Sequence, residues 1–201
     1  NRKFILFLFL LLICLVLVSP IAFGIGIAVI LDSNGPIFFS TKRVGKNGKL
    51  FKIYKFRTMQ FQSQGSGLGI TKINDDRITK VGKFIRRNRL DEIPQLYNII
   101  RGDMSIVGPR PEDPKYVTYF KSDYKILLSV RPGCVSPGWI KYRDEMIFRS
   151  LNENKSISHE DYYLESVLPR KIEEDISYLK KSSFLNDLNV IYKAIISLLF
   201  K

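Results

Sequence analysis

A long uncharged segment near the start of the chain constrains the fold more than any other feature. The run Phe4–Leu31 contains 28 residues without a charged side chain, preceded by Arg2 and Lys3 and followed by Asp32. As a continuous helix it would extend for about 42 Å, whereas the hydrocarbon core of a bilayer is about 30 Å thick. It is too long for a signal peptide and lacks a small-residue cleavage site. We therefore expect the segment to enter a membrane.

The pair Ser19-Pro20 interrupts this apolar run. Proline removes a backbone donor and collides with the carbonyl four residues earlier, while a serine hydroxyl can bond back to a carbonyl of its own helix. We expect the helix to be broken at this pair. Lysines and arginines flank both ends of the run, and such cations favour the cytoplasmic side of a membrane. Residues 1–33 are therefore predicted to form a re-entrant membrane helix, with a straight span as the alternative.

Residues 34–201 have the composition of a soluble domain and are expected to form one folded unit. Turn residues at 34–36 and 44–49 separate two extended runs, 37–40 and 50–56, which predicts a small β-hairpin. Apolar residues at helical spacing predict helices at 78–89, 90–100, 112–130, 160–181 and 184–200. The expected fold class is therefore α+β and mostly helical, with amphipathic surface helices around a compact domain. The apolar stripe of 184–200 fits a membrane surface or the domain core equally well.

The charge of the chain points to an anionic partner. Lys and Arg number 32 against 19 Asp and Glu, for a formal net charge of +13. Nucleic acid, phosphorylated small molecules and an acidic membrane face all fit this excess, and composition does not choose among them. The two cysteines, Cys14 and Cys134, provide neither a metal-ligand spacing nor a disulfide framework, which favours a reducing, cytoplasmic setting.

Three arginines precede an acidic pair in the segment that runs from Arg86 to Glu92. Arginines close to the acidic pair Asp91-Glu92 would hold phosphate oxygens, while the carboxylates stay ionised and bind a divalent cation. A carboxylate can also attack phosphorus once substrate charge is neutralised. The segment thus suits phosphoryl chemistry. From the pair alone, a second interpretation stays open: the two acids cap a helix and pair with the arginines before them.

Four motifs in a fixed order add to this interpretation: Lys55-Phe56-Arg57-Thr58-Met59, Leu90-Asp91-Glu92-Ile93-Pro94-Gln95-Leu96, the segment 102–111 and Arg131-Pro132-Gly133. Together they resemble the bacterial initiating sugar transferases, the monotopic polyprenyl-phosphate phosphoglycosyl transferases. The resemblance extends from Phe4 to about Asn189, because the Ser19-Pro20 pair also matches the break in the family's re-entrant helix.

The resemblance implies an enzyme that moves a sugar-1-phosphate from a UDP-sugar to polyprenyl (undecaprenyl) phosphate, the first membrane step of a surface glycan or glycoprotein pathway. Asp91 would attack the β-phosphate, releasing UMP and forming a covalent phosphosugar intermediate, and Glu92 together with Asp91 would hold Mg²⁺. Arg86 and Arg110 would contact substrate phosphate oxygens. The motif residues Lys55 and Arg57 would bind either these phosphates or lipid headgroups.

The same resemblance implies a catalytic domain, residues 34–201, on the cytoplasmic face of the inner (plasma) membrane. Its partners would be a UDP-sugar, polyprenyl phosphate and membrane lipid, without nucleic acid, and a homodimer stays open. Two departures bear on substrate contacts: Arg89 replaces a small hydroxyl residue of many relatives, and residues 134–145 form a candidate region for sugar choice. The alternative function is that of a non-catalytic, basic, membrane-tethered protein that binds lipid or nucleic acid.

Overall fold

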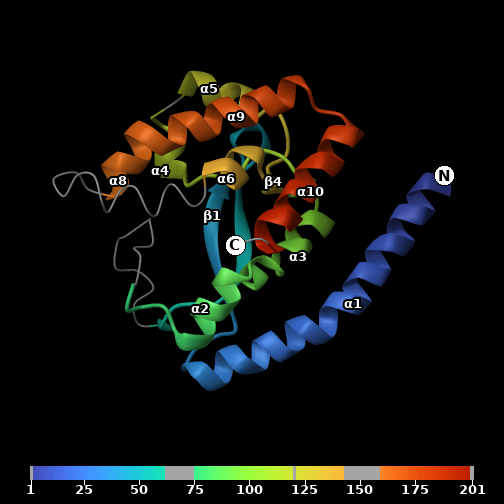
Figure 1. Ribbon diagram of the computed structural model, residues 1–201, viewed down its shortest axis with the longest axis vertical. Coiled ribbons are helices and arrows are strands. Elements are labelled where there is room, and N and C mark those ends of the chain that lie inside the picture. The colour runs from blue at the N-terminus through green and yellow to red at the C-terminus, as the bar shows by residue number, and fades with distance from the viewer. Residues whose placement is uncertain (1, 62–74, 120, 143–158, 200–201) are drawn as a thin grey trace. The chain divides into compact units, whose positions relative to one another are not determined.

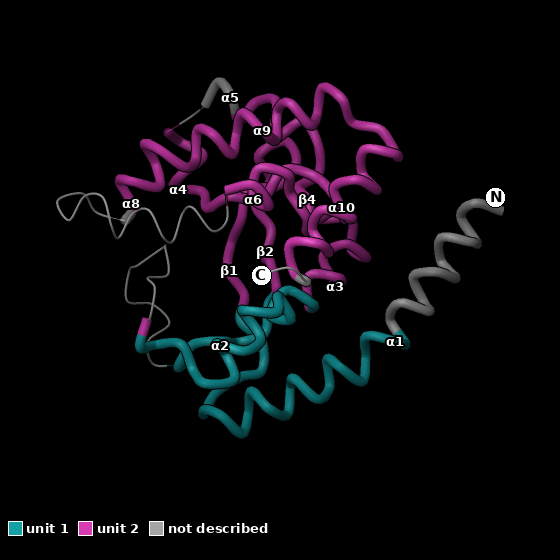
Figure 2. The backbone as a smooth tube through the Cα atoms, viewed as in Figure 1, with its two compact units in different colours: residues 1–39, 55–65, 76–93 teal, residues 40–54, 66–75, 94–201 magenta. Residues whose placement is uncertain are grey.

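The computed structural model describes residues 2–61, 75–119, 121–142 and 159–199. The chain divides into two compact units (Figure 2). Unit 1 comprises residues 1–39, 55–65 and 76–93, and unit 2 comprises residues 40–54, 66–75 and 94–201. In the described ranges helices predominate over two small sheets of two strands each, which confirms the mostly helical α+β class (Figure 1).

Helix α1, Arg2–Asp32, is a single helical element that contains Pro20, and the re-entrant path predicted for it stays a prediction. The Ser19 hydroxyl donates a hydrogen bond of 3.0 Å to the carbonyl of Val16. This is the carbonyl to which residue 20 would donate if it had an N–H, so the hydroxyl replaces the bond that proline cannot make. Over the part of the chain that the structure describes, no helix has both the length and the apolar character required to cross a membrane.

Unit 1 has a core formed where α1 meets helix α2, Lys80–Arg87. Its buried members are Ile25, Val29, Phe56 and Ile85. Burying side chains of this size contributes about 1.5–3 kcal/mol each. Helix α2 begins where Thr79 accepts a hydrogen bond from the Gly82 amide at 3.0 Å. A Cβ on Gly82 would lie 2.2 Å from the Thr58 carbonyl oxygen, so only glycine permits this close approach.

The predicted hairpin is confirmed by strands β1, Phe38–Val44, and β2, Leu50–Phe56, which pair in one sheet. The turn between them, η1 (Lys46–Gly48), is a single 3-10 turn. Asn47 and Gly48 there have φ values of 57° and 76°, in the left-handed region that asparagine and glycine adopt most readily.

The predicted helix over 90–100 is divided in two. A 3-10 turn, η3 (Leu90–Glu92), ends before Pro94, and helix α3, Gln95–Ile100, follows. Pro94 has no N–H to donate back to the preceding turn, so the hydrogen-bond pattern is interrupted and a new helix starts there, although Ile93 keeps helical angles (φ −50°, ψ −41°).

Unit 2 contains most of the remaining elements. They are β3 (Ser105–Val107), α4 (Pro114–Val117), α5 (Lys121–Leu127), β4 (Gly133–Val135), α6 (Pro137–Tyr142), α8 (His159–Tyr162), η4 (Tyr163–Val167), α9 (Leu168–Lys180) and α10 (Phe184–Leu199). Strands β3 and β4 pair in parallel, with Ser105 opposite Gly133. Sequence analysis did not predict this sheet, because strands of three residues are too short to show an alternating pattern.

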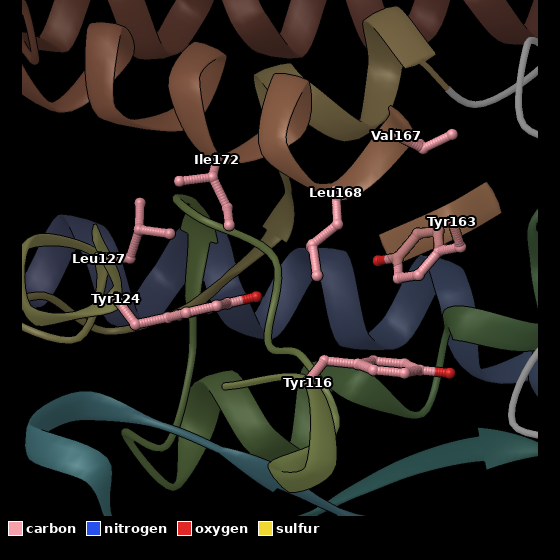
Figure 3. Packing of buried hydrophobic residues seen from close by; sticks show 7 residues of the cluster. All are labelled: Tyr116, Tyr124, Leu127, Tyr163, Val167, Leu168 and Ile172. Carbon is pink, nitrogen blue, oxygen red and sulfur yellow. The ribbon is translucent and has the colours of Figure 1, made fainter. Parts of the chain in front are cut away.

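The core of unit 2 lies beneath α9 (Figure 3). Leu168 and Ile172 point from α9 toward the rings of Tyr116 and Tyr124. The core therefore joins the two regions, 112–130 and 160–181, for which amphipathic helices were predicted, although the first forms two short helices.

The final helix, α10, leaves much of its apolar stripe exposed. Phe184 is 76% exposed, Leu188 is 47% exposed and Ile195 is 50% exposed. These side chains do not pack in the domain core, which was one of the two alternatives for this stripe.

Candidate active site

The acidic pair Asp91-Glu92 lies in the one-turn helix η3, immediately after α2 ends. Between the two elements Arg89 adopts a left-handed conformation, with φ 58° and ψ 17°. This conformation costs a non-glycine residue about 1–2 kcal/mol. The reversal is closed by a hydrogen bond of 3.2 Å from the Glu92 amide to the Arg89 carbonyl. The backbone thus presents two adjacent carboxylates directly after an arginine-rich helix.

Cationic side chains of unit 1 converge on this pair. The Lys55 ammonium lies 2.7 Å from Glu92 Oε1 and 3.9 Å from Asp91 Oδ2. The Arg89 guanidinium lies 3.7 Å from Glu92 Oε2. Lys55 comes from the end of β2, so a residue more than thirty positions away in sequence joins the acidic pair. The structure therefore brings Lys55, Asp91 and Glu92, three of the residues singled out in the sequence, into one cluster.

Asp91 is 9% exposed, and its surroundings perturb its acidity. Burial raises the pKa of Asp91, the Lys55 charge opposes this, and the neighbouring Glu92 carboxylate adds to the increase. Arg86 and Arg89 lower the pKa in turn, without reversing the net rise. A carboxylate largely stripped of water but surrounded by cations is suited to nucleophilic attack on an anionic substrate, because the cations attract the substrate and offset part of the cost of burying the carboxylate charge.

Arg86 projects from the last turn of α2 and is held in place by a neighbouring residue. Its Nε donates a hydrogen bond of 2.7 Å to the hydroxyl of Thr58. Since its charge also acts on Asp91, Arg86 belongs to the same cluster and keeps its place among the predicted phosphate contacts.

Arg57 does not lie where a substrate could contact it, although its motif suggested such a contact. The side chain is only 1% exposed. Its Nε donates to the Pro36 carbonyl at 2.6 Å, and its Nη1 donates to the Ser33 hydroxyl at 2.6 Å. Further bonds reach the backbone carbonyls of Val29, Ser33, Asn34 and Gly35. The guanidinium thus closes the C-terminal end of α1 and the turn after it, and we leave Arg57 out of the proposed substrate contacts.

The acidic pair was also the predicted site of Mg²⁺. Among the described side chains, no group of three or more His, Cys, Asp or Glu residues could hold a metal ion. Mg²⁺ commonly binds through one or two carboxylates and completes its shell with water and substrate phosphates. Asp91 and Glu92, both only 12% exposed in their side chains, match that donor set. The residues present therefore fit a metal ion that arrives with a phosphorylated substrate.

Arg110, the other predicted phosphate contact, belongs to unit 2. Its guanidinium lies over the ring of Trp139, 5.0 Å from the ring centroid. Its backbone amide donates a long hydrogen bond of 3.4 Å to Asp175. The half-buried Arg110 side chain is thereby stacked on an aromatic face, an arrangement that guanidinium groups favour.

Comparison with known proteins identifies the family. A model of the bacterial sugar transferase family matches residues 2–201. This chain belongs to that family. A UDP-N-acetylgalactosamine-undecaprenyl-phosphate N-acetylgalactosaminephosphotransferase of Aeromonas hydrophila is 35% identical over 186 residues, which cover 91% of this chain and 40% of that protein.

Other relatives are named for a different sugar, glucose. A UDP-glucose:undecaprenyl-phosphate glucose-1-phosphate transferase of Escherichia coli (strain K12) is 33% identical over 89% of this chain and 36% of its own length. The enzyme of the same description from Caulobacter vibrioides is 31% identical over 91% of this chain and 64% of its own length. The chain thus spans less than two thirds of the length of these relatives. Most of the region 134–145, a candidate for sugar choice, lies in β4 and α6, and only its part beyond Tyr142 falls outside the described residues.

Sequence analysis did not predict a buried polar network in unit 2. The Lys171 ammonium donates to Glu112 at 2.6 Å and to the Tyr163 hydroxyl at 2.8 Å. Burial alone would raise the pKa of Glu112, but the charge and hydrogen bond of Lys171 outweigh it and lower the pKa. Glu112 is more than fifty positions from the other two residues and shares no motif with them, so only tertiary structure reveals that they meet.

Asp175 is the second buried carboxylate of this network and accepts hydrogen bonds from the Ser136 hydroxyl at 2.9 Å and the Gly138 amide at 2.8 Å. Burial outweighs these bonds and raises the pKa of Asp175 from 3.8 to about 6. Asp175 thus anchors the turn into α6 and the backbone of Arg110.

Asp175 makes the stability of the protein depend on pH. Between about pH 4 and pH 6 the folded protein keeps a proton that the unfolded chain has released, so stability should fall as pH rises. The full decrease across this window is about 3 kcal/mol. Denaturant unfolding at stepped pH values should show this decrease in the free energy of unfolding. In Asp175→Asn the decrease over the same pH window should be smaller by about 3 kcal/mol. Equal decreases in both proteins would contradict the assignment.

Proposed function

We propose that the chain transfers a sugar-1-phosphate from a UDP-sugar to undecaprenyl phosphate, through a phosphosugar bound covalently to Asp91. The observation that carries the proposal is the buried acidic pair with Lys55 2.7 Å from Glu92 and with Arg86 and Arg89 acting on Asp91. Family membership and the printed activities of the relatives support the same reaction class.

In the first half-reaction a carboxylate oxygen of Asp91 attacks the β-phosphorus of the donor. A new bond forms between this oxygen and phosphorus, and the bond from phosphorus to the bridging oxygen breaks, so that UMP departs with that oxygen. Two anions must meet in this step, and the charges of Lys55, Arg86 and Arg89 reduce their repulsion. Burial of Asp91 removes water that would compete as a nucleophile.

In the second half-reaction a phosphate oxygen of the lipid attacks the phosphorus of the acyl phosphate. The bond to Asp91 breaks, the carboxylate is regenerated, and the sugar leaves on a lipid-linked diphosphate. The same cations offset the charge that returns to the carboxylate. Mg²⁺, bound by Asp91 and Glu92 together with donor phosphates, would supply further neutralisation of phosphate charge.

The proposed acceptor places the reaction at a membrane. Exposed apolar side chains support this location in both units. In α1 they include Phe23 at 72% and Leu31 at 81%, and in α10 they include Phe184 at 76%. We propose that α1 is the re-entrant membrane element and that the catalytic residues work at the cytoplasmic face, where the cations after α1 would lie.

The direct test offers the purified protein a panel of UDP-sugars with undecaprenyl phosphate and measures release of UMP. We expect turnover with at least one UDP-sugar, and reversible loss of turnover when a chelator removes divalent cations. Absence of UMP release with every donor, in protein shown to be folded, would reject the proposed function. Turnover that survives chelation would instead reject the metal alone.

A further inference from the structure

Unit 2 contains a cationic hollow. It has a volume of about 680 Å³, within the range of pockets for small molecules. Its walls come from the β1–β2 hairpin, from the turn after α3 and from the start of the Arg131-Pro132-Gly133 motif. We name it the basic cleft after its cations: Lys42, Lys46, Lys49, Lys52, Arg101 and Arg131. None of them has a role in the function proposed above.

The charge of the basic cleft is strongly unbalanced. Against its six cations the lining includes one carboxylate, Asp103, which lies 3.4 Å from the Arg101 guanidinium. Like charges gathered around one concavity repel one another and focus a positive potential into it. An anion with several charges, placed in the hollow, would relieve that repulsion at many cations at once.

The backbone beneath the cations is firmly held. The Asn98 side chain is 0% exposed and joins α3 to strand β2: its Oδ1 accepts from the Tyr54 amide at 3.2 Å, and its Nδ2 donates to the Lys52 carbonyl at 2.7 Å. The turn of the hairpin is tied down by a bond of 2.7 Å from the Asn47 amide to the Leu128 carbonyl. The cations therefore project from a preorganised frame, which lowers the entropic cost of binding a ligand.

The turn after α3 brings one guanidinium close to the backbone. Gly102 has a φ of 79°, and a Cβ there would lie 3.8 Å from the Arg131 guanidinium. The positive φ reverses the chain so that Arg101 and Arg131 line the same hollow. Guanidinium groups bind phosphate oxygens in bidentate fashion, which lysines alone do not.

We propose that the basic cleft is a binding site for a polyphosphate anion, meaning a group with two or more phosphate charges held close together. Either a soluble diphosphate or clustered phospholipid headgroups would present this chemistry. All residues that line the basic cleft belong to unit 2, and the function proposed above assigns none of them a role.

The test uses the full chain in phosphatidylcholine nanodiscs and inorganic pyrophosphate as the probe, with binding measured by calorimetry. Two variants each remove two charges from different walls: Arg101→Gln with Arg131→Gln, and Lys49→Gln with Lys52→Gln. We expect each double variant to weaken pyrophosphate binding by about 30-fold, since each of its two lost contacts removes roughly 1 kcal/mol at a solvated site. The matched control, Lys115→Gln with Lys141→Gln, removes two exposed charges that pair elsewhere, with Glu160 and Glu174.

Two results would overturn the proposal: undetectable binding of pyrophosphate to the unmodified protein, or equal weakening in the control. To distinguish the two sources of the anion, pyrophosphate binding is measured again in nanodiscs that also contain phosphatidylglycerol. If lipid headgroups occupy the cleft, this lipid should weaken pyrophosphate binding to the unmodified protein. If the ligand is soluble, phosphatidylglycerol should leave the affinity unchanged, and both results support a polyphosphate site.

Discussion

Asp91→Asn is expected to lower the rate of UMP release by on the order of 10³-fold or more. An amide oxygen is a poor nucleophile toward phosphorus, whereas the shape of the side chain is retained. The variant should also fold normally. Burial raises the pKa of Asp91 because desolvation penalises its charge, and the neutral amide of asparagine does not carry that penalty.

The matched control for this variant is Asp76→Asn, which makes the same substitution at an exposed position of the same unit and should keep full activity. Mass spectrometry of protein incubated with donor alone provides a second measurement. It should find the mass of a sugar phosphate on the peptide that contains Asp91, and this adduct should be missing from Asp91→Asn. Turnover in Asp91→Asn close to that of the control would contradict the covalent route.

Local patterns in the sequence were sufficient to predict several elements. The hairpin was predicted because turn residues at 44–49 separate two extended runs, and β1 and β2 confirm it. Helix α2 was predicted from apolar residues at helical spacing, and Ile85 is indeed buried. These signals are local, because hydrogen bonding and side-chain direction within one element repeat with its own period.

Contacts between distant segments had no such signal. The parallel pair β3 and β4 joins residues 28 positions apart, as in Ser105 with Gly133, through strands of three residues. The network of Glu112, Tyr163 and Lys171 likewise depends on the folding of α9 over the core. Residue type and spacing carry no information on such pairs until the topology is known.

The candidate site shows the same limit within a single motif. Sequence analysis gave Lys55 and Arg57 the same role, because both belong to one motif of the family that the sequence resembles. In the structure Lys55 contacts the acidic pair at 2.7 Å, whereas Arg57 is buried and donates to backbone carbonyls after α1. Which cation meets a carboxylate and which meets a backbone turn is decided by the path of α1, which the motif does not encode.

This difference leads to a prediction about stability: Arg57→Lys should reduce the free energy of unfolding by about 3–5 kcal/mol, even though the positive charge is kept. A lysine ammonium cannot reproduce the planar fork that reaches Pro36, Asn34 and Ser33 together. Several buried carbonyls would then lose their donors, and a compact charge would remain poorly solvated in a site that is 1% exposed.

Chemical denaturation without any substrate measures this effect, so the result does not depend on the proposed reaction. Arg87→Lys is the matched control, because it makes the same exchange at an exposed position of α2 in the same unit. We expect the control to change stability by less than about 0.5 kcal/mol. If Arg57→Lys were as stable as the control but bound donor more weakly, the carbonyl contacts would be dispensable and the residue would belong with the substrate contacts after all.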